Sequence, residues 1–183
     1  DKPFYDTSGG GVTLTGGEVM LWPDFVVALC DALHARSVHV AIETAACVPE
    51  DVFLRVLAHV DFAYIDLKHY DEEKHREATG AGLGLIRKNI AAALRSATPA
   101  VVRIPVIPGF NDSPAGFSRF AEALNALGAK KVQLLPFHQL GESKYDRLGL
   151  PYAFDGIPQM HDEDVSAFAQ TLKDAGLDVQ IGG

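Results

Sequence analysis

The sequence predicts an α/β protein with a parallel sheet, folded as a partial (β/α) barrel. Short runs rich in β-branched residues alternate with amphipathic stretches of helical spacing, and this alternation implies βα units with parallel strands. The chain has 183 residues, enough for one domain but fewer than the about 250 that a complete eight-fold barrel typically needs. We therefore expect five or six βα units in a single domain that spans residues 1–183. A doubly wound open sheet is the alternative architecture.

Six runs of β-branched and apolar residues are the candidate strands. The letters AYIDL and VVRIPV look apolar on both faces, as a sheet covered by helices requires. In chain order the six strands are Val12–Thr15, Val38–Thr44, Phe62–Asp66, Val101–Val106, Lys131–Pro136 and Asp178–Ile181.

Five amphipathic stretches separate these strands. Their apolar residues recur every three or four positions, as on one face of a helix. The stretches are Asp24–Arg36 (with Phe25, Val26, Leu29 and Leu33), Asp51–Val60, Leu83–Ser96, Gly116–Leu127 (with Phe117, Phe120, Ala121, Leu124 and Leu127) and Asp162–Ala175.

The composition argues against several classes of function. The formal charge is −8, from 16 Lys and Arg against 24 Asp and Glu, and there is no basic cluster, so we do not expect a nucleic-acid partner. No apolar run reaches the about 18 residues of a membrane-spanning helix, and no signal-peptide pattern opens the chain. The two cysteines cannot build a disulfide scaffold, which favours the reducing cytoplasm. Cys30 lies on an apolar helical stripe and is expected in the core, whereas Cys47 lies in a loop.

Several familiar catalytic motifs are missing from the sequence. There is no G-x-x-x-x-G-K-[ST] phosphate loop, no G-x-S-x-G nucleophile elbow and no H-E-x-x-H zinc helix. The seven histidines are scattered, and no cysteine cluster could hold an iron–sulfur centre.

Polar side chains gather where the predicted strands end. In parallel α/β folds these carboxyl ends, and the loops that follow them, form the active site. Residues from separate strands would face one opening, and their mixture of charges suits a small anionic or zwitterionic ligand. The set comprises Thr15, Gly16, Gly17 and Glu18 after the first strand, Glu43 and Thr44 in the second, Asp66 and Lys68 at the third, Arg103 in the fourth and His138 after the fifth.

The first and third strand ends also have purely structural explanations. Gly16-Gly17 could form only a turn, although two residues without side chains would also let a ligand approach the backbone while Glu18 accepts a hydrogen bond from a cationic group. Asp66 and Lys68 are two positions apart in a strand and share a face, so they could form a structural ion pair as readily as a ligand site.

Arg103 and His138 differ in how readily packing explains them. An arginine inside an apolar strand is rarely buried without a partner, so Arg103 needs either a carboxylate or a bound anion. His138 follows a Leu-Leu-Pro strand end, where a lone histidine is more often a packing residue than a catalyst.

Five segments together resemble a known family. The letters SGGGVTLTGGE of residues 8–18 look like the SGGGVT-x-SGGE segment of the radical S-adenosylmethionine (SAM) enzymes that activate glycyl radical enzymes. The segments AIET (41–44), IDLK (65–68), RIPVIPG (103–109) and LLPFHQLGESKY (134–145) follow in the family's order. The last three are specific in combination, because unrelated barrels have no reason to share all of them.

The resemblance implies both a fold and a reaction. The fold would be a partial TIM-like (β/α)6 barrel that binds SAM beside a [4Fe–4S] cluster. Reductive cleavage of SAM, with an electron donor such as flavodoxin, would yield methionine and a 5′-deoxyadenosyl radical. That radical would take a hydrogen atom from a glycine of a partner enzyme such as pyruvate formate-lyase.

The resemblance also assigns roles to residues. It implies that the methionine amino group is held by the GGE segment, that its carboxylate pairs with Lys68, and that a monovalent cation can bind beside SAM. Glu43 replaces an aspartate of the family and is one methylene longer. By role, the implied residues are Gly16, Gly17 and Glu18 for the amino group, Lys68 for the carboxylate, Arg103 and His138 for the pocket wall, and Glu43, Thr44 and Asp66 around SAM and the cation.

The family's three cluster ligands, in a C-x3-C-x2-C loop, precede the GGE segment, and residues 1–17 contain no cysteine. We therefore expect this chain to be a piece of a longer activase, truncated at its first barrel strand and without the cluster loop. Such a piece should be inactive alone and should bind SAM weakly at best. Its exposed sheet edge should make it prone to self-association.

Two other functions are considered. One is a degenerate barrel that binds a protein without catalysis, which the intact polar set argues against. The other is a radical SAM enzyme for a small molecule, which the Gly141–Tyr145 segment argues against because that segment belongs to the activases. The sequence does not distinguish pyruvate formate-lyase from a related dehydratase as the partner.

Overall fold

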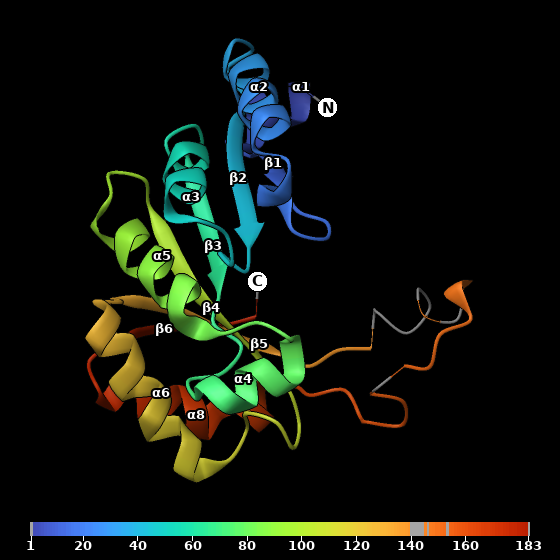
Figure 1. Cartoon of the computed structure of the whole chain (residues 1–183), viewed down its shortest axis with the longest axis vertical. Coiled ribbons are helices and arrows are strands. Elements are labelled where there is room, and N and C mark those ends of the chain that lie inside the picture. The colour runs from blue at the N-terminus through green and yellow to red at the C-terminus, as the bar shows by residue number, and fades with distance from the viewer. Residues whose placement is uncertain (1, 140–144, 146, 153, 183) are drawn as a thin grey trace.

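The computed structural model describes residues 2–139, 145, 147–152 and 154–182, and six strands of these residues form one sheet (Figure 1). The strands follow one another across the sheet in chain order, and all neighbours are parallel. A doubly wound sheet reverses its strand order at a switch point, so this order excludes that alternative and agrees with a partial barrel. The strands are β1 (Gly11–Leu14), β2 (His39–Thr44), β3 (Phe62–Asp66), β4 (Ala100–Val106), β5 (Lys131–Pro136) and β6 (Asp178–Ile181).

The five predicted helices are present, each close to its expected bounds. The first begins at Pro23, because a proline N–H is not needed in the opening turn of a helix. The last is divided into a 3₁₀ turn, η2 (Asp162–Val165), and α8 (Ser166–Asp174). That first helix is α2 (Pro23–His34). The three helices between it and the last are α3 (Glu50–Leu57), α5 (Leu83–Arg95) and α6 (Pro114–Leu127). Within the described residues, no helix is long and apolar enough to span a membrane.

The sequence analysis did not predict α1 (Lys2–Ser8) or α4 (Glu72–Thr79). α4 has the sequence EEKHREAT and buries only His75, so it has no apolar period to detect. Its start is fixed by Asp71, whose carboxylate accepts hydrogen bonds from the N–H groups of Glu73 and Lys74, both at 3.0 Å.

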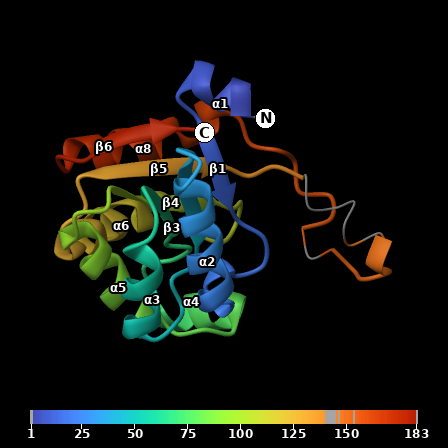
Figure 2. The ribbon, with the colours of Figure 1, turned by 90° about the horizontal axis from the view of Figure 1, so that it is seen from above.

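The main helices cover one face of the sheet, not both (Figures 1 and 2). In β3, Ala63 and Ile65 are buried in the core, whereas Tyr64 and Asp66 are only partly buried. β4 alternates in the same way around Arg103. The expectation that these strands are apolar on both faces is therefore wrong, because every second residue faces the inside of the barrel instead of a helix.

The strand register aligns these inward-facing residues. Paired residues of adjacent parallel strands put their side chains on the same face of the sheet. We call this face, which the main helices leave uncovered, the inner face; its aligned residues include Glu43, Tyr64, Asp66, Arg103, Gln133 and Gln180.

Candidate functional site

Four charged side chains from β2, β3 and β4 form one network at the carboxyl ends of the strands. Arg103 lies between two carboxylates: Nη1 donates to Glu43 Oε1 at 2.9 Å, and Nε donates to Asp66 Oδ1 at 3.1 Å. Lys68 Nζ donates to the other oxygen of Asp66, Oδ2, at 2.9 Å. Two positive and two negative charges meet here, so this charge network of Glu43, Asp66, Lys68 and Arg103 is neutral.

Arg103 is held more firmly than Lys68. Its side chain is 12% exposed, against 34% for Lys68, and its guanidinium lies over the Tyr64 ring, 5.1 Å from the centroid. Burial acts to lower the pKa of Arg103, but the hydrogen bond to Glu43 and the charge of Asp66 outweigh it and raise the pKa above its ordinary value. Arg103 is therefore a fixed positive charge, whereas Lys68 has a single carboxylate partner and a more exposed side chain.

A cavity of about 470 Å³ opens beside the charge network. Arg103, Glu43 and His138 contribute to its wall, as the sequence predicts for a ligand pocket. Gln133 also lines it, and its carboxamide oxygen Oε1 is buried with no hydrogen-bond donor among the described residues. The full lining is Thr13, Glu43, Tyr64, Arg103, Gln133, Leu135, Pro136, His138 and Gly182.

The Gly16-Gly17 turn is connected to the charge network through Thr15, and Thr15, Gly17 and Glu18 line a separate cavity of about 320 Å³. Thr15 Oγ1 donates to Glu43 Oε2 at 3.2 Å. Gly16 has φ +137, which favours glycine, so the turn explanation holds for that position. Gly17 has no such φ, and a Cβ there would meet nothing within 4 Å. Nothing in the described structure requires glycine at 17, which favours the approach of a ligand to the backbone.

Glu18 connects the turn to the end of β2. Its Oε1 accepts hydrogen bonds from the Met20 N–H at 3.1 Å and from Thr44 Oγ1 at 2.6 Å. Its Oε2 accepts from the Ala45 N–H at 2.9 Å. Glu18 thereby caps the 3₁₀ turn η1 (Val19–Leu21), and most of its acceptor capacity is used within the protein.

Thr44 is not brought together with Glu43 and Asp66. It follows Glu43 in β2, so its side chain is on the opposite face, where the hydroxyl contacts Glu18 and accepts from the Ala46 N–H at 2.9 Å. Only 4% of Thr44 is exposed. Its part in a cation site stays a prediction without a side-chain contact to support it.

Three contributors were missed from the sequence. Tyr64 and Gln133 lie inside strands, and the prediction considered mainly residues at strand ends. Tyr64 could have been found, because it is two positions before Asp66 and so shares its face. Asn111 is 2% exposed; its Nδ2 donates to the carbonyls of Lys68 and Pro105, each at 2.8 Å, and its Oδ1 accepts from the Ile107 N–H at 2.8 Å. It joins the loops after β3 and β4 and fixes the backbone of Lys68.

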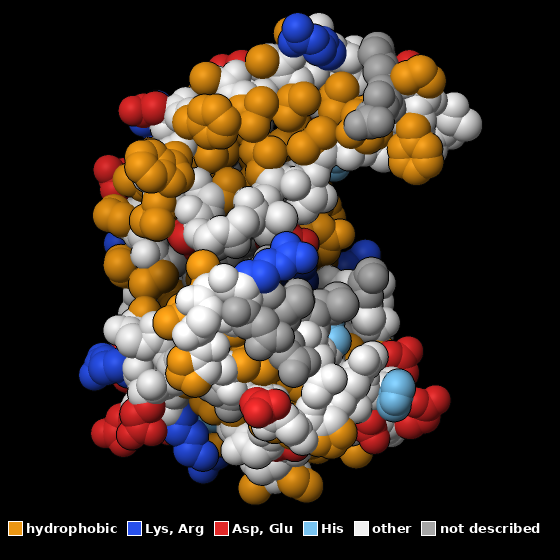
Figure 3. Space-filling model, turned by 90° about the vertical axis from the view of Figure 1, so that its right-hand side faces the viewer, with side chains coloured by type: hydrophobic (Ala, Val, Ile, Leu, Met, Phe, Trp, Pro, Cys, Tyr) orange, Lys and Arg blue, Asp and Glu red, His pale blue; other side chains and the backbone are white. Residues whose placement is uncertain are grey.

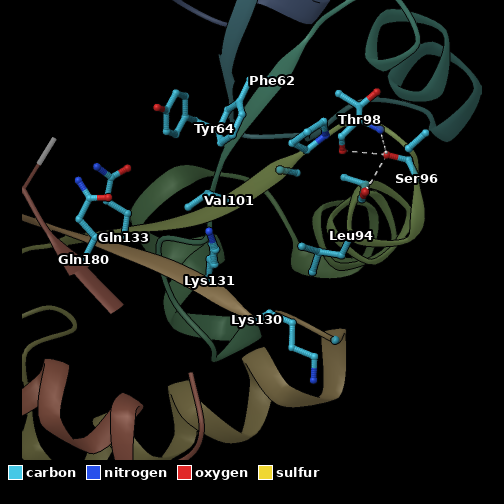
Figure 4. A pocket seen from close by; sticks show the side chains of 15 residues that line it. Phe62, Tyr64, Leu94, Ser96, Thr98, Val101, Lys130, Lys131, Gln133 and Gln180 are labelled. Atoms are coloured by element: carbon cyan, nitrogen blue, oxygen red, sulfur yellow. Dashed lines mark hydrogen bonds between the residues drawn. The ribbon is translucent and has the colours of Figure 1, made fainter. Parts of the chain in front are cut away.

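A second cavity, of about 490 Å³, lies at the opposite, amino ends of the strands (Figure 4). Its wall carries the aromatic pair Phe62 and Tyr64 and the lysines Lys130 and Lys131. None of the predicted site residues lines it. The two cavities share Tyr64 and Gln133, so they adjoin along the inner face.

The cysteines do not form a cluster site. Cys30 is fully buried on the helix side of the sheet, as expected, and burial raises the pKa of its thiol. Cys47 is half-buried against the same core. Among the described residues, no three His, Cys, Asp or Glu side chains are grouped to hold a metal ion, so this part of the chain lacks ligands for a [4Fe–4S] cluster.

Comparison with known proteins identifies the family. The family model for the radical SAM superfamily matches residues 5–121. The chain belongs to the radical SAM superfamily. Enzymes of this superfamily use SAM and a [4Fe–4S] cluster, and the resemblance inferred from the sequence motifs is confirmed. Of the LLPFHQLGESKY segment (134–145) that helped to carry it, residues 140–144 lie outside the described residues.

Similar proteins are activating enzymes. The benzylsuccinate synthase activating enzyme of Thauera aromatica is 42% identical over 100% of this chain, and the pyruvate formate-lyase 2-activating enzyme of Escherichia coli is 34% identical over 100% of it. The chain spans 57% and 63% of their lengths. A solved domain of a pyruvate-formate lyase-activating enzyme from Bacteroides vulgatus matches with a TM-score of 0.77 and 28% identity, over 95% of this chain and 99% of that one.

Proposed function

We propose that this chain is the SAM-binding part of an enzyme that activates a glycyl radical enzyme. The observation that carries the proposal is the neutral charge network, which places Lys68 and Arg103 beside a cavity at the carboxyl ends of the strands. The superfamily match and the names of the similar activating enzymes support it. The intact network argues against a degenerate, purely protein-binding barrel.

The residues fit SAM by charge and by access. Lys68, with its partly exposed ammonium, can leave Asp66 for the carboxylate of SAM, while Arg103 keeps Asp66 and Glu43 in place. The backbone around Gly16 and Gly17 can approach the SAM ammonium because no side chain stands in the way. Gln133 adds a carboxamide acceptor to the cavity wall that no donor of the described residues uses.

The residues of the site orient the ligand and fix the charges around it. Bound SAM would supply the radical chemistry: one electron from the cluster of the longer protein would cleave it to methionine and a 5′-deoxyadenosyl radical, which would take a hydrogen atom from a glycine of the partner. Asn111 holds the Lys68 backbone, and Tyr64 packs under Arg103, so the groups that meet the ligand stay positioned before it arrives. His138 completes the wall on the β5 side.

The remaining parts of the reaction belong to the longer protein and its partners. We infer that the cluster ligands come from outside this chain, because the described residues contain no suitable set. A glycyl radical enzyme such as pyruvate formate-lyase is the proposed partner, a flavodoxin the proposed electron donor, and the cytoplasm the proposed compartment.

Substitution of Arg103 in the longer activase tests the proposal. We expect Arg103→Ala to raise the dissociation constant for SAM about 10–100-fold, because Glu43 and Asp66 lose the guanidinium that neutralises them and holds them in place. Release of methionine and 5′-deoxyadenosine should fall with it. Arg103→Lys keeps the charge without the two-pronged geometry and should be intermediate.

Arg119→Ala is the matched control, since Arg119 is an exposed arginine on α6 whose ion-pair partner is Glu122. Circular dichroism verifies that each variant is folded. Unchanged SAM affinity and cleavage in folded Arg103→Ala would refute the assignment of the pocket.

A further inference from the structure

Every carboxylate oxygen of the charge network already has a donor within the chain. Glu43 accepts from Arg103 on Oε1 and from Thr15 on Oε2. Asp66 accepts from Arg103 on Oδ1 and from Lys68 on Oδ2. The guanidinium of Arg103 thus occupies the space between the two carboxylates, where a metal cation would meet a like charge at short range.

The residues implied as a cation site do not fit one in this structure. The hydroxyl of Thr44 is on the other face of β2, bonded to Glu18, and cannot join Glu43 and Asp66. The charge balance points the same way: the network sums to zero, so it has no excess negative charge to attract Na⁺ or K⁺. SAM itself carries one net positive charge, and a metal ion would add a second beside it.

The length of Glu43 explains how Arg103 takes this position. Glu43 is on β2 and Arg103 is on β4, with β3 between them, so their backbones are separated by two strand spacings of about 4.8 Å each. Two long side chains close that distance and give an Nη1–Oε1 contact of 2.9 Å. An aspartate at 43 would lose one methylene of reach and with it the contact to Arg103 Nη1, which would leave Arg103 paired with Asp66 alone.

We propose that Arg103 takes the place of the monovalent cation in this chain, so that SAM is held without Na⁺ or K⁺. The role of Arg103 is then to neutralise Glu43 and Asp66 permanently, while Lys68 exchanges between Asp66 and the ligand. This inference rests on the proposed function for its SAM half. Its cation half concerns the protein's own residues and can be measured without SAM.

The melting temperature tests the cation half on the 183-residue chain. We expect the Tm of the unmodified chain to agree within about 1 °C in NaCl, KCl and choline chloride of equal ionic strength, because no site distinguishes the cations. Arg103→Gln leaves Glu43 and Asp66 together without the guanidinium. Its Tm should be about 2–4 °C higher in NaCl or KCl than in choline chloride.

Two further variants control this series. Glu43→Asp should show a smaller response of the same sign, and it keeps the test available if Arg103→Gln does not fold. Arg119→Gln, an exposed arginine on α6, should show none. A Tm of the unmodified chain that depends on Na⁺ or K⁺ would overturn the inference. So would folded Arg103→Gln and Glu43→Asp chains whose Tm does not depend on these cations.

Titration with SAM in the same three salts tests the SAM half of the inference, that SAM is held without Na⁺ or K⁺. The dissociation constant of the unmodified chain should change by less than about twofold between salts. Weakening of fivefold or more in choline chloride would show that a metal cation takes part and would contradict the inference. Absence of SAM binding in every salt would count against the proposed function, whereas the melting series would still decide the role of Arg103.

Discussion

Gly16 and Gly17 differ in why each is a glycine, and substitution separates the two reasons. Gly16→Ala forces a side chain into φ +137 and should lower the free energy of unfolding by about 1–3 kcal/mol. Gly17→Ala meets no neighbour and needs no unusual φ, so stability should stay within about 0.5 kcal/mol of the original. SAM affinity should nevertheless fall in Gly17→Ala, because the new methyl group stands where the ligand approaches.

Urea unfolding and SAM titration of both variants check this prediction. A folded Gly17→Ala chain with the original SAM affinity would mean that the second glycine serves no ligand. A Gly16→Ala chain of unchanged stability would show that the turn relaxes without strain.

Single residues also show where sequence reasoning reaches its limit. The positions of Asp66 and Lys68 at the end of β3, and of Arg103 inside β4, could be predicted as one site, because parallel strands bring their carboxyl ends to one edge. The pairing of Arg103 with Glu43 could not, since it depends on which strands are neighbours and on the reach of two side chains. Asn111 contacts Lys68 across 43 positions of sequence, a contact that no local pattern reveals.

At the scale of elements, β1 and η1 leave an apolar surface uncovered. Leu21, Trp22 and Phe25 are 63%, 71% and 66% exposed, and they border a pocket of about 320 Å³ that also includes Leu14 of β1. Figure 3 shows hydrophobic side chains gathered over the upper part of this face. Within the described residues β1 pairs only with β2, so its other edge is open.

We therefore expect the 183-residue chain to self-associate as its concentration rises, because open edges and apolar patches both favour association. Sedimentation velocity measures this. Trp22→Lys should shift the distribution toward the monomer, whereas Leu85→Lys, at an exposed leucine on α5 outside the patch, should not. A single monomeric species at the highest attainable concentration would contradict the prediction.

The strands and helices were predictable to different degrees for physical reasons. Runs of β-branched and apolar residues identified the six strands of the described sheet: β2 to β5 each have a buried apolar side, and the edge strands β1 and β6 are partly buried. α4 was not predicted because it has one buried residue and therefore no hydrophobic period. Its start is fixed by the Asp71 cap instead. The inner face was misjudged because AYIDL and VVRIPV were taken as continuous apolar runs, whereas Tyr64, Asp66 and Arg103 occupy alternate positions that face the inside of the barrel.

For the whole molecule, the sequential strand order gives the two ends of the barrel different chemistry. The cavity at the carboxyl ends contains Glu43, Arg103 and His138, whereas the one at the amino ends contains Lys130 and Lys131. The two have similar volumes, so size does not identify the ligand site. The charge network and the Gly16–Gly17 approach do, and both are at the carboxyl ends.

The most direct test of this assignment is an NMR titration of the ¹⁵N-labelled chain with SAM. We predict saturable shifts of the backbone signals of Gly17 and Lys68 and of the side-chain Nε signal of Arg103, with no change at Lys130 or Lys131. Weak binding is sufficient, because the shifts locate the ligand at any measurable occupancy. Shifts confined to the amino ends, or no saturable shifts at all, would contradict the account.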